Sequence, residues 1–254
     1  MKYLIWSYDY RHDSGGPKVL HRLCHELNEA GQEAYVGWLV TNPDWNTPFH
    51  DEPLSGDWTA IYPEIVSGNP WNAPHVVRWV LNNPGLLGGD TVYDPSETVF
   101  TFSPLFMDAP VLMLPTIELD IYFDRHLPRE GAVFYVGKGQ RTRDIPGTEI
   151  TNELKADREL LAETLNRAEV LYSFDIISGM TDIARLCGCP VVLIPDDLRT
   201  RGQYDNWFGW DGVGWDEMPE PFDSVAFHSR YAGLYDTFLG QLADFIRATD
   251  PVLA

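Results

Sequence analysis

The fold is decided by the stretch VLYSFDIISGMTDIARLCGCPVVLI, residues 170–194. Its two ends, residues 170–174 and 191–194, are short apolar runs with the length and composition of buried strands. Ser178 is a suitable N-cap for a helix that we predict over residues 178–187. A strand, a helix and a second strand in this order form a parallel unit, so the sequence predicts an α/β fold with doubly wound parallel sheets.

The same alternation precedes this stretch. A strand is predicted at residues 132–136, and a helix at residues 157–168 with three leucines turned inward. These leucines are Leu160, Leu161 and Leu165. The charged, proline-containing segment 124–130 lies just before the strand, and we predict that it is a linker between two α/β domains.

An earlier series of elements fills the first half of the chain. We predict a strand at residues 3–8, a loop at 9–16 and a helix at 17–30, with proline in its first turn. Further strands are predicted at residues 34–40, 59–66, 99–102 and 111–114, and a helix at 73–81 with Val76, Val77 and Val80 inward. The sequence contains no recognisable internal repeat. We therefore predict domains at residues 1–126 and 127–228.

The carboxyl-terminal segment is amphipathic over residues 229–248 and needs a partner surface. Its apolar face carries Leu234, Phe238, Leu242, Phe245 and Ile246. With 254 residues and 44% apolar content, the chain is long enough to bury a sizeable core, in one large or two small domains.

Charge and hydropathy exclude several classes of partner. A formal net charge of -20 argues against phosphate neutralisation, so we expect no nucleic-acid partner. No apolar run approaches the roughly 20 residues that cross a bilayer. The first residues, MKYLIWSYDY, lack the pattern of a signal peptide. We therefore expect no transmembrane segment and a cytoplasmic location.

Three short segments could carry chemistry, and the first precedes the helix at residues 17–30. It contains Asp13, Gly15 and Gly16. Glycine lets the backbone approach a ligand closely, and the free N–H groups of a helix N-terminus favour an anion. The spacing differs from the dinucleotide pattern G-x-G-x-x-G, and the alternative is a tight turn.

The second segment joins strand to helix within the deciding stretch. The amides of Gly179, Met180 and Thr181 would point outward at the carboxyl edge of the sheet, which suits a diphosphate. Asp175, at the strand end, could accept hydrogen bonds from ribose or sugar hydroxyls. Alternatively, Ser178 only caps its own helix and Asp175 interacts with the helix dipole.

The third segment is YVGKG, residues 135–139, in which a strand runs into a lysine between glycines. Lys138, after Gly137 on a short loop at the end of a strand, can neutralise phosphate. Two arginines follow closely in sequence, at positions 141 and 143. The alternative is an ordinary surface lysine.

Taken together and in order, five blocks of sequence resemble a branch of the GT-B-type glycosyltransferases of bacteria and phages, similar to families 1 and 4. The blocks are SGGPKVLHRLC (14–24), YPEIVSGNP (62–70), VVRWVLNNPG (76–85), YVGKG (135–139) and LCGCPVV (186–192). The resemblance covers most of residues 1–200, and its specificity lies in the order of the blocks.

The resemblance implies two facing Rossmann-like domains, with the acceptor mainly on the first and the nucleotide sugar mainly on the second. The helix at the end of the chain, within residues 229–254, would cross back to the first domain. The implied activity is transfer from a UDP-, GDP- or dTDP-linked sugar to a glycan or protein acceptor, in a bacterial or phage-infected cytoplasm. The alternatives are a nucleotide-sugar epimerase and a non-catalytic nucleotide-sugar-binding module.

The resemblance also implies roles for the candidate residues. Gly15 and Gly16 would face the donor phosphates or the transferred sugar. Lys138, after Gly137, would serve the diphosphate. The remaining donor contacts would come from Asp175 to a hydroxyl and from Ser178, Gly179, Met180 and Thr181 to phosphate.

The sequence departs from the family pattern at two places. Ile183 stands where many members carry the second of two glutamates, so Asp175 or Asp182 must substitute in ribose recognition. The chain is also short for two full domains, and we expect an element to be trimmed between Gly139 and Ile150.

Glycosyl transfer requires neutralisation of the leaving nucleotide and, if configuration inverts, deprotonation of the acceptor. Asp13 and His12, beside the glycines, are the first candidates for the base, and Glu64 is the second. Alternatively, His12 is simply exposed and Glu64 pairs with Arg78.

The resemblance implies transfer without a metal or another cofactor. Two pairs of aspartates occur in the sequence, Asp120 with Asp124 and Asp196 with Asp197. Neither pair forms an Asp-x-Asp triplet.

Overall fold

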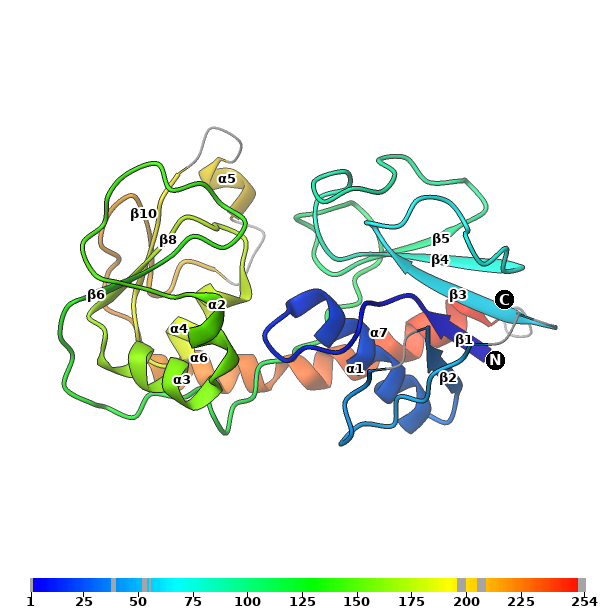
Figure 1. Cartoon of the computed structure of the whole chain (residues 1–254), viewed down its shortest axis with the longest axis horizontal. Coiled ribbons are helices and arrows are strands. Elements are labelled where there is room, and N and C mark those ends of the chain that lie inside the picture. Colours follow the sequence, from blue (N-terminus) through cyan, green and yellow to red (C-terminus); the bar gives the residue numbers. More distant parts are fainter. Residues whose placement is uncertain are drawn as a thin grey trace. The chain divides into compact units, whose positions relative to one another are not determined.

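The computed structural model describes residues 2–37, 40–51, 54, 56–195, 200–204 and 209–250. The chain forms two compact units, Met1–Thr116 with Leu234–Ala254 and Ile117–Gly233. Each unit contains a five-stranded sheet in which all strand pairs are parallel (Figure 1). The chain therefore has a mixed α/β, Rossmann-like fold. The units divide near residue 116, ahead of the segment 124–130 expected to be a linker.

The first unit is built on the sheet β2-β1-β3-β4-β5. Its elements are β1 (Lys2–Ile5), α1 (Gly15–Glu29), β2 (Glu33–Val36), β3 (Trp58–Pro63), β4 (His75–Val80), β5 (Thr98–Thr101) and α7 (Leu234–Thr249). Ser14 is the N-cap of α1, and Gly31, at a φ of 80°, follows its end. The expected loop over residues 9–16 is thus wrong at its end, because Gly15 and Gly16 already belong to the first turn of α1.

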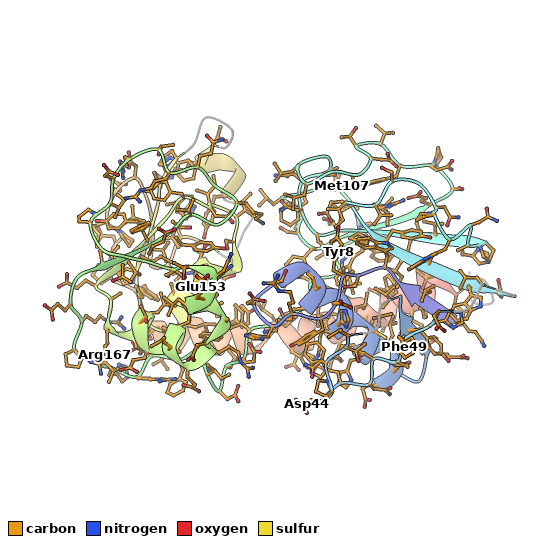
Figure 2. The ribbon with its side chains drawn as sticks, viewed as in Figure 1. Tyr8, Asp44, Phe49, Met107, Glu153 and Arg167 are labelled. Carbon is orange, nitrogen blue, oxygen red and sulfur yellow. The ribbon has the colours of Figure 1, made fainter. Side chains whose placement is uncertain are left out.

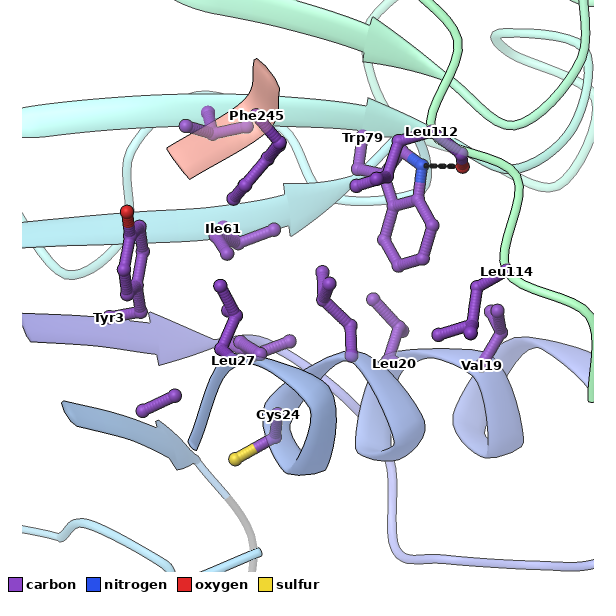
Figure 3. Packing of buried hydrophobic residues seen from close by; sticks show 14 of the residues in the cluster. Tyr3, Val19, Leu20, Cys24, Leu27, Ile61, Trp79, Leu112, Leu114 and Phe245 are labelled. Atoms are coloured by element: carbon purple, nitrogen blue, oxygen red, sulfur yellow. Dashed lines mark hydrogen bonds between the residues drawn. The ribbon is translucent and has the colours of Figure 1, made fainter. Parts of the chain in front are cut away.

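One face of the first sheet packs against both α1 and α7 (Figure 3). The buried residues come from α1 (Val19, Leu20, Leu23, Leu27), from the strands (Tyr3, Ile5, Ile61, Val77, Trp79, Phe100) and from α7 (Phe238, Leu242, Phe245). The indole N–H of Trp79 donates to the carbonyl oxygen of Leu112 at 3.1 Å, so its polar atom is satisfied inside the core. The apolar face of the carboxyl-terminal helix is therefore covered within the first unit.

The helix predicted at residues 73–81 is wrong, because this segment forms the strand β4 between β3 and β5. Its neighbouring valines face opposite sides of the sheet. Val77 joins the core under α1, whereas Val76 packs with Ala60 and Tyr62 on the other face. A strand buried on both faces is apolar throughout, so the spacing of its valines also fits a helix.

The second unit is built on the sheet β10-β9-β8-β6-β7. Its elements are β6 (Ala132–Tyr135), β7 (Thr148–Glu149), α2 (Asn152–Ala156), α3 (Arg158–Arg167), β8 (Val170–Ser173), α4 (Gly179–Leu186), β9 (Val191–Leu193), α5 (Arg201–Tyr204), β10 (Val213–Trp215) and α6 (Ser224–Ala232). The predicted N-cap is confirmed, since the side chain of Ser178 accepts a hydrogen bond from the amide of Met180. All residues between β6 and β7 are described, and they form no helix, as expected of a trimmed connection.

The inward face of α3 differs from the prediction at one leucine. Leu161 and Leu165 are buried, but Leu160 is 49% exposed. Residues four apart share a helix face, whereas neighbouring residues are turned by about 100°. Within the described part of the chain, no helix combines the length and apolarity needed to cross a membrane.

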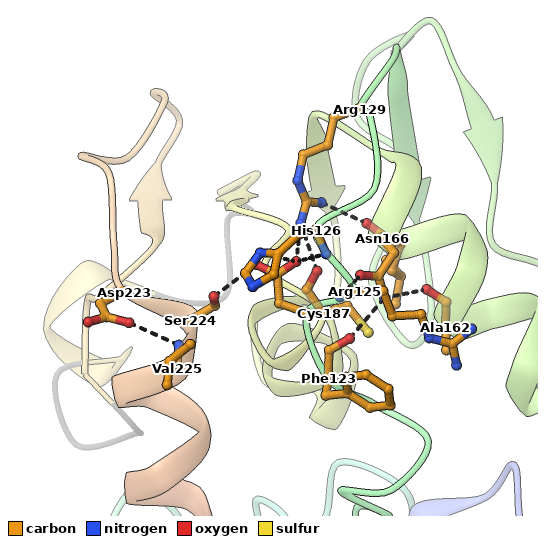
Figure 4. A network of polar contacts seen from close by, with 12 residues as sticks. Phe123, Arg125, His126, Arg129, Ala162, Asn166, Cys187, Asp223, Ser224 and Val225 are labelled. Carbon is orange, nitrogen blue, oxygen red and sulfur yellow. Dashed lines mark hydrogen bonds and ion pairs between the residues drawn. The ribbon is translucent and has the colours of Figure 1, made fainter.

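A half-buried polar network holds the predicted linker inside the second unit (Figure 4). The guanidinium of Arg129 donates to the carbonyl oxygen of Cys187 at 2.8 Å and pairs with Asp124 at 3.3 Å. Asp124 also accepts a hydrogen bond from the hydroxyl of Ser224 at 2.9 Å. Asn166, on α3, accepts a hydrogen bond from the amide of Arg125 at 2.6 Å and donates to the carbonyl oxygen of Phe123, just before the segment, at 3.0 Å. These contacts explain why residues 124–130 do not separate the two units.

Both sheets have the same strand order. Counted from the first strand of its own unit, each sheet runs 2-1-3-4-5. The order reverses between β1 and β3 in the first sheet and between β6 and β8 in the second. Ligands of such sheets bind outside the carboxyl ends of the strands at this point. We call the loops after β1 and β3 the first switch point, and those after β6 and β8 the second switch point.

Candidate functional site

At the second switch point, the turn after β6 is tied to the segment after β8. The backbone N–H of Lys138 donates to Asp175 Oδ2 at 3.1 Å. Gly137 has a φ of 55°, and a Cβ atom there would lie 2.6 Å from Asp175 Oδ2 and 2.6 Å from Cε1 of Tyr135. Only glycine fits this position. Residues from two separate motifs are thus brought together at one sheet edge.

Asp175 is fully buried, and its contact with a ribose or sugar hydroxyl stays a prediction. Its side chain binds the Lys138 amide, and its backbone carbonyl accepts from the hydroxyl of Ser173 at 2.8 Å. Close packing continues at Gly139, where a Cβ atom would lie 1.9 Å from the carbonyl oxygen of Phe174. Asp175 is therefore a positioning residue that fixes the turn carrying Lys138.

The start of α4 offers fewer ligand contacts than the sequence suggested. The Met180 amide donates to Ser178 Oγ at 3.2 Å, and the Thr181 amide donates to the carbonyl oxygen of Ser178 at 3.1 Å. Met180 and Thr181 are buried and both amides have these partners, so their contact with phosphate stays a prediction. Gly179 is exposed, and a Cβ atom there would meet nothing within 4 Å. Ser178 and Gly179 therefore remain as the accessible residues.

The second candidate for ribose recognition, Asp182, is also engaged. It forms an ion pair with Arg185, and both side chains are buried. The guanidinium of Arg185 lies 4.2 Å from the ring centroid of Phe227. Because Asp182 neutralises a buried cation, neither it nor Asp175 is presented to a ligand. The carboxylate pair predicted at residues 196 and 197 lies outside the described residues.

Tyr135, at the end of β6, and Lys155, on α2, meet beside the second switch point, although neither was predicted as a site residue. Burial raises the pKa of Tyr135, the charge of Asp175 raises it further, and a side-chain hydrogen bond with Ser178 lowers it. Lys155 Nζ, on α2, lies 5.5 Å from the ring centroid of Tyr135. Neither a motif nor a spacing links the two positions; the only available signal was the scarcity of lysine.

At the first switch point, Asp13 is bound by its neighbour Arg11. The guanidinium Nε and Nη2 atoms donate to the two carboxylate oxygens at 3.1 and 2.8 Å. This hydrogen-bonded pair holds the pKa of Asp13 below its usual value. His12 is half-buried in the same loop. Gly15 and Gly16 are exposed, and a Cβ atom at either would meet nothing within 4 Å.

Glu64 follows β3, across the first switch point from that loop. Its side chain is buried, and Oε2 accepts a hydrogen bond from the amide of Leu81 at 2.9 Å. Arg78, the partner suggested by the sequence, is held in an ion pair with Glu97 at 2.9 Å. A Cβ atom on Gly89 would lie 1.9 Å from the carbonyl oxygen of Glu64, so a second loop packs directly against this residue.

His21, on α1, lies under the loop after β1 and was not predicted as a site residue. It is fully buried, and its Nε2 atom lies 2.9 Å from the carbonyl oxygen of Tyr8. Because a carbonyl can only accept, Nε2 carries the proton in the neutral ring. Nδ1 has no hydrogen-bond partner among the described residues. Burial lowers the pKa of His21 below its ordinary value of 6.5.

We expect His21 to make the folded protein less stable as the pH falls. Below about pH 6.5 the unfolded chain protonates this histidine, whereas the folded chain does so only at a lower pH. The contribution of His21 to the free energy of unfolding is therefore lost as the pH falls from about 6.5 toward the lower pKa of the folded state. Urea unfolding between pH 7.5 and 5 should show a smaller pH slope for His21→Gln, which cannot titrate. His126→Gln, which removes an exposed histidine, is the control. A pH slope in His21→Gln equal to that of the wild type would contradict the expectation.

The two sheets place this chain among the α/β proteins of Rossmann-like fold. No protein-family model matches it, and no curated protein matches its sequence. Among solved structures, it is similar to a functionally uncharacterized protein from Klebsiella pneumoniae subsp. pneumoniae NTUH-K2044. That likeness has a TM-score of 0.46 and 11% identity, and it covers 82% of this chain and 88% of that chain.

Proposed function

We propose that this protein is a glycosyltransferase of the GT-B class, which transfers a sugar from a nucleoside-diphosphate sugar to a glycan or protein acceptor. The observation that carries the proposal is the turn at the second switch point, where buried Asp175 binds the Lys138 amide. That turn shares its sheet edge with the exposed Gly179 at the start of α4. The second unit would bind the donor, and the first unit would bind the acceptor.

The chemistry requires stabilisation of the departing nucleoside diphosphate. An ammonium group at Lys138 and the amino end of α4 would both favour the negative charge that develops on the leaving group. The whole chain carries a net charge of -20, so its long-range field opposes an anionic donor. Binding therefore depends on cations placed at the site itself. No metal or other cofactor is part of the proposal.

The base that deprotonates the acceptor would come from the first switch point. Asp13 is kept ionised by Arg11, whereas Glu64 is buried. His12 stays a candidate beside Asp13. The lowered pKa of Asp13 weakens it as a base but keeps it deprotonated over a wider range of pH.

If Asp13 is the base, Arg11→Gln should move the acid limb of the pH–rate profile to higher pH. A base must be deprotonated to act, and removing the guanidinium lets the pKa of Asp13 return toward its ordinary value. The measurement is the initial rate of transfer between pH 3.5 and 7. Arg247→Gln, which removes a distant exposed ion pair, is the control. Identical profiles for Arg11→Gln and the wild type would assign the base to His12 or Glu64.

A non-catalytic nucleotide-sugar-binding module is the second candidate. It is favoured by the ion pairs that engage Asp13 and Asp182. A nucleotide-sugar epimerase is the third candidate, and no interaction among the described residues favours it over the other two.

One experiment separates these functions. The protein is incubated with UDP-, GDP- and dTDP-linked sugars, with and without EDTA, and nucleotide release and sugar identity are followed by chromatography. Slow release from one donor, unchanged by EDTA and lost in Lys138→Met, supports the transferase. Interconversion of the sugar indicates an epimerase. Binding without turnover indicates a binding module.

A further inference from the structure

Two lysines stand apart from the other cations of this acidic chain. Most of the described arginines form an ion pair with a carboxylate. Of the four lysines, Lys2 pairs with Glu33 at 3.0 Å and Lys18 is buried. Among the described residues, Lys138 and Lys155 have no carboxylate within ion-pair distance. The chain has many acidic side chains, so the lack of a carboxylate partner reflects the surroundings of these two lysines and not a shortage of carboxylates.

Lys155 and the turn that carries Lys138 both lie at the ring of Tyr135. Lys155 Nζ is 5.5 Å from the ring centroid, a distance at which a cation is attracted to an aromatic face. Gly137, the residue before Lys138, packs so closely that a Cβ atom there would lie 2.6 Å from Cε1 of the same ring. At one sheet edge, the ring therefore contacts the ammonium group of Lys155 and packs against the turn that carries Lys138.

The acidic neighbour of Lys155 on α2 is engaged elsewhere. The pKa of Glu153, labelled in Figure 2, is lowered by a hydrogen bond with its own backbone and, to a smaller extent, by one with the side chain of Thr151 at the start of the helix. Asp175 accepts a hydrogen bond from the backbone amide of Lys138. Glu153 and Asp175 therefore both have partners other than the two lysine ammonium groups.

We propose that Lys155, held in place by Tyr135, is a second anion-binding residue of the donor site. Lys138 and Lys155 together bind the two phosphates of the donor, and each phosphate gains a cationic partner. Neither ammonium group has a carboxylate partner among the described residues, so a dianion bound at this edge would be attracted by both. The identity of the ligand as a nucleotide-sugar donor rests on the proposed function, whereas the anion site itself does not depend on it.

The test uses inorganic pyrophosphate and inorganic phosphate, titrated into the full chain by calorimetry at low ionic strength. Pyrophosphate should bind more tightly than phosphate. Lys155→Met, which keeps the apolar stem over the ring, should weaken pyrophosphate binding by roughly tenfold, as the loss of a charge-assisted hydrogen bond does. Lys155→Arg should restore most of the affinity. Tyr135→Leu should weaken binding in the same direction, because Lys155 loses its support.

Lys2→Met is the matched control, since it removes a lysine whose charge is already paired. Wild-type pyrophosphate affinity in Lys155→Met, with weaker binding in Lys138→Met, would overturn the role of Lys155 and leave the proposed function standing. Pyrophosphate binding that needs both lysines, without any binding or turnover of nucleotide sugars, would support the anion site and contradict the transferase. If wild-type protein binds neither anion, the inference is wrong.

Discussion

Replacing Asp175 by leucine is expected to remove most of the affinity for pyrophosphate and for the nucleotide sugar. The carboxylate is the hydrogen-bond acceptor for the Lys138 amide, and it is fully buried. Leucine has a similar size but leaves that N–H unpaired, which costs about 1 to 3 kcal/mol. If the turn leaves its place to find water, the affinity should fall by roughly tenfold or more.

Asp175→Asn is the informative companion of the leucine variant. Its amide oxygen can still accept from the Lys138 amide, so the turn should stay in place and most of the affinity should remain. The measurements are calorimetric titration with pyrophosphate and urea unfolding of each variant. Asp144→Asn, an exposed carboxylate near the same turn, controls for the change in net charge. Equal affinity in Asp175→Leu and wild type would show that the buried carboxylate does not position Lys138.

The sequence predicted which loops meet but not which side chains are presented. Gly137 and Lys138 follow one strand, and Asp175 follows its neighbour in the sheet. The carboxyl ends of parallel neighbours share an edge, so the alternation of strands and helices was enough to bring these loops together. Whether a side chain at a strand end faces solvent depends on the opposite loop. That loop buries Asp175, and no spacing encodes it.

The same limit explains the residues that were missed. Lys155 reaches Tyr135 from α2, a short helix without an apolar pattern and without buried residues. His21 lies on the buried side of α1 and has the periodicity of a core position. Sequence periodicity distinguishes buried from exposed positions, but it does not show which buried polar atom lacks a partner.

Fold prediction failed where burial is two-sided or where contacts are distant in sequence. The strand β4 has apolar residues on both faces, which removes the alternation that would have identified it. The linker was misplaced because Arg129 and Asp124 are fixed by side chains and carbonyls from α3, α6 and the end of α4. The common strand order of the two sheets leaves no repeat in the sequence, because it is a property of topology.

The largest loss of stability is expected at the buried ion pair of the first unit. Arg78 is fully buried and donates to both carboxylate oxygens of Glu97 at 2.9 and 3.0 Å. It also donates to the carbonyl oxygens of Val66 at 2.6 Å and Gly68 at 2.9 Å. Glu97→Leu leaves this cation without its counter-charge, so the free energy of unfolding should fall by about 3 to 5 kcal/mol.

The double variant Arg78→Met with Glu97→Leu should lose less stability than the sum of the two single variants, because no buried charge is left unpaired. It would still leave the carbonyl oxygens of Val66 and Gly68 without their donor.

These carbonyls belong to the loop that begins with Glu64 at the first switch point. We therefore expect the double variant to lower transfer to the acceptor while pyrophosphate affinity stays at the wild-type value. Urea unfolding of all four proteins measures the change in stability, and a transfer assay with calorimetry of the double variant measures the two effects on function. Strict additivity of the stability losses would mean that the two charges do not depend on each other. A loss of pyrophosphate binding would contradict the assignment of donor and acceptor to separate units.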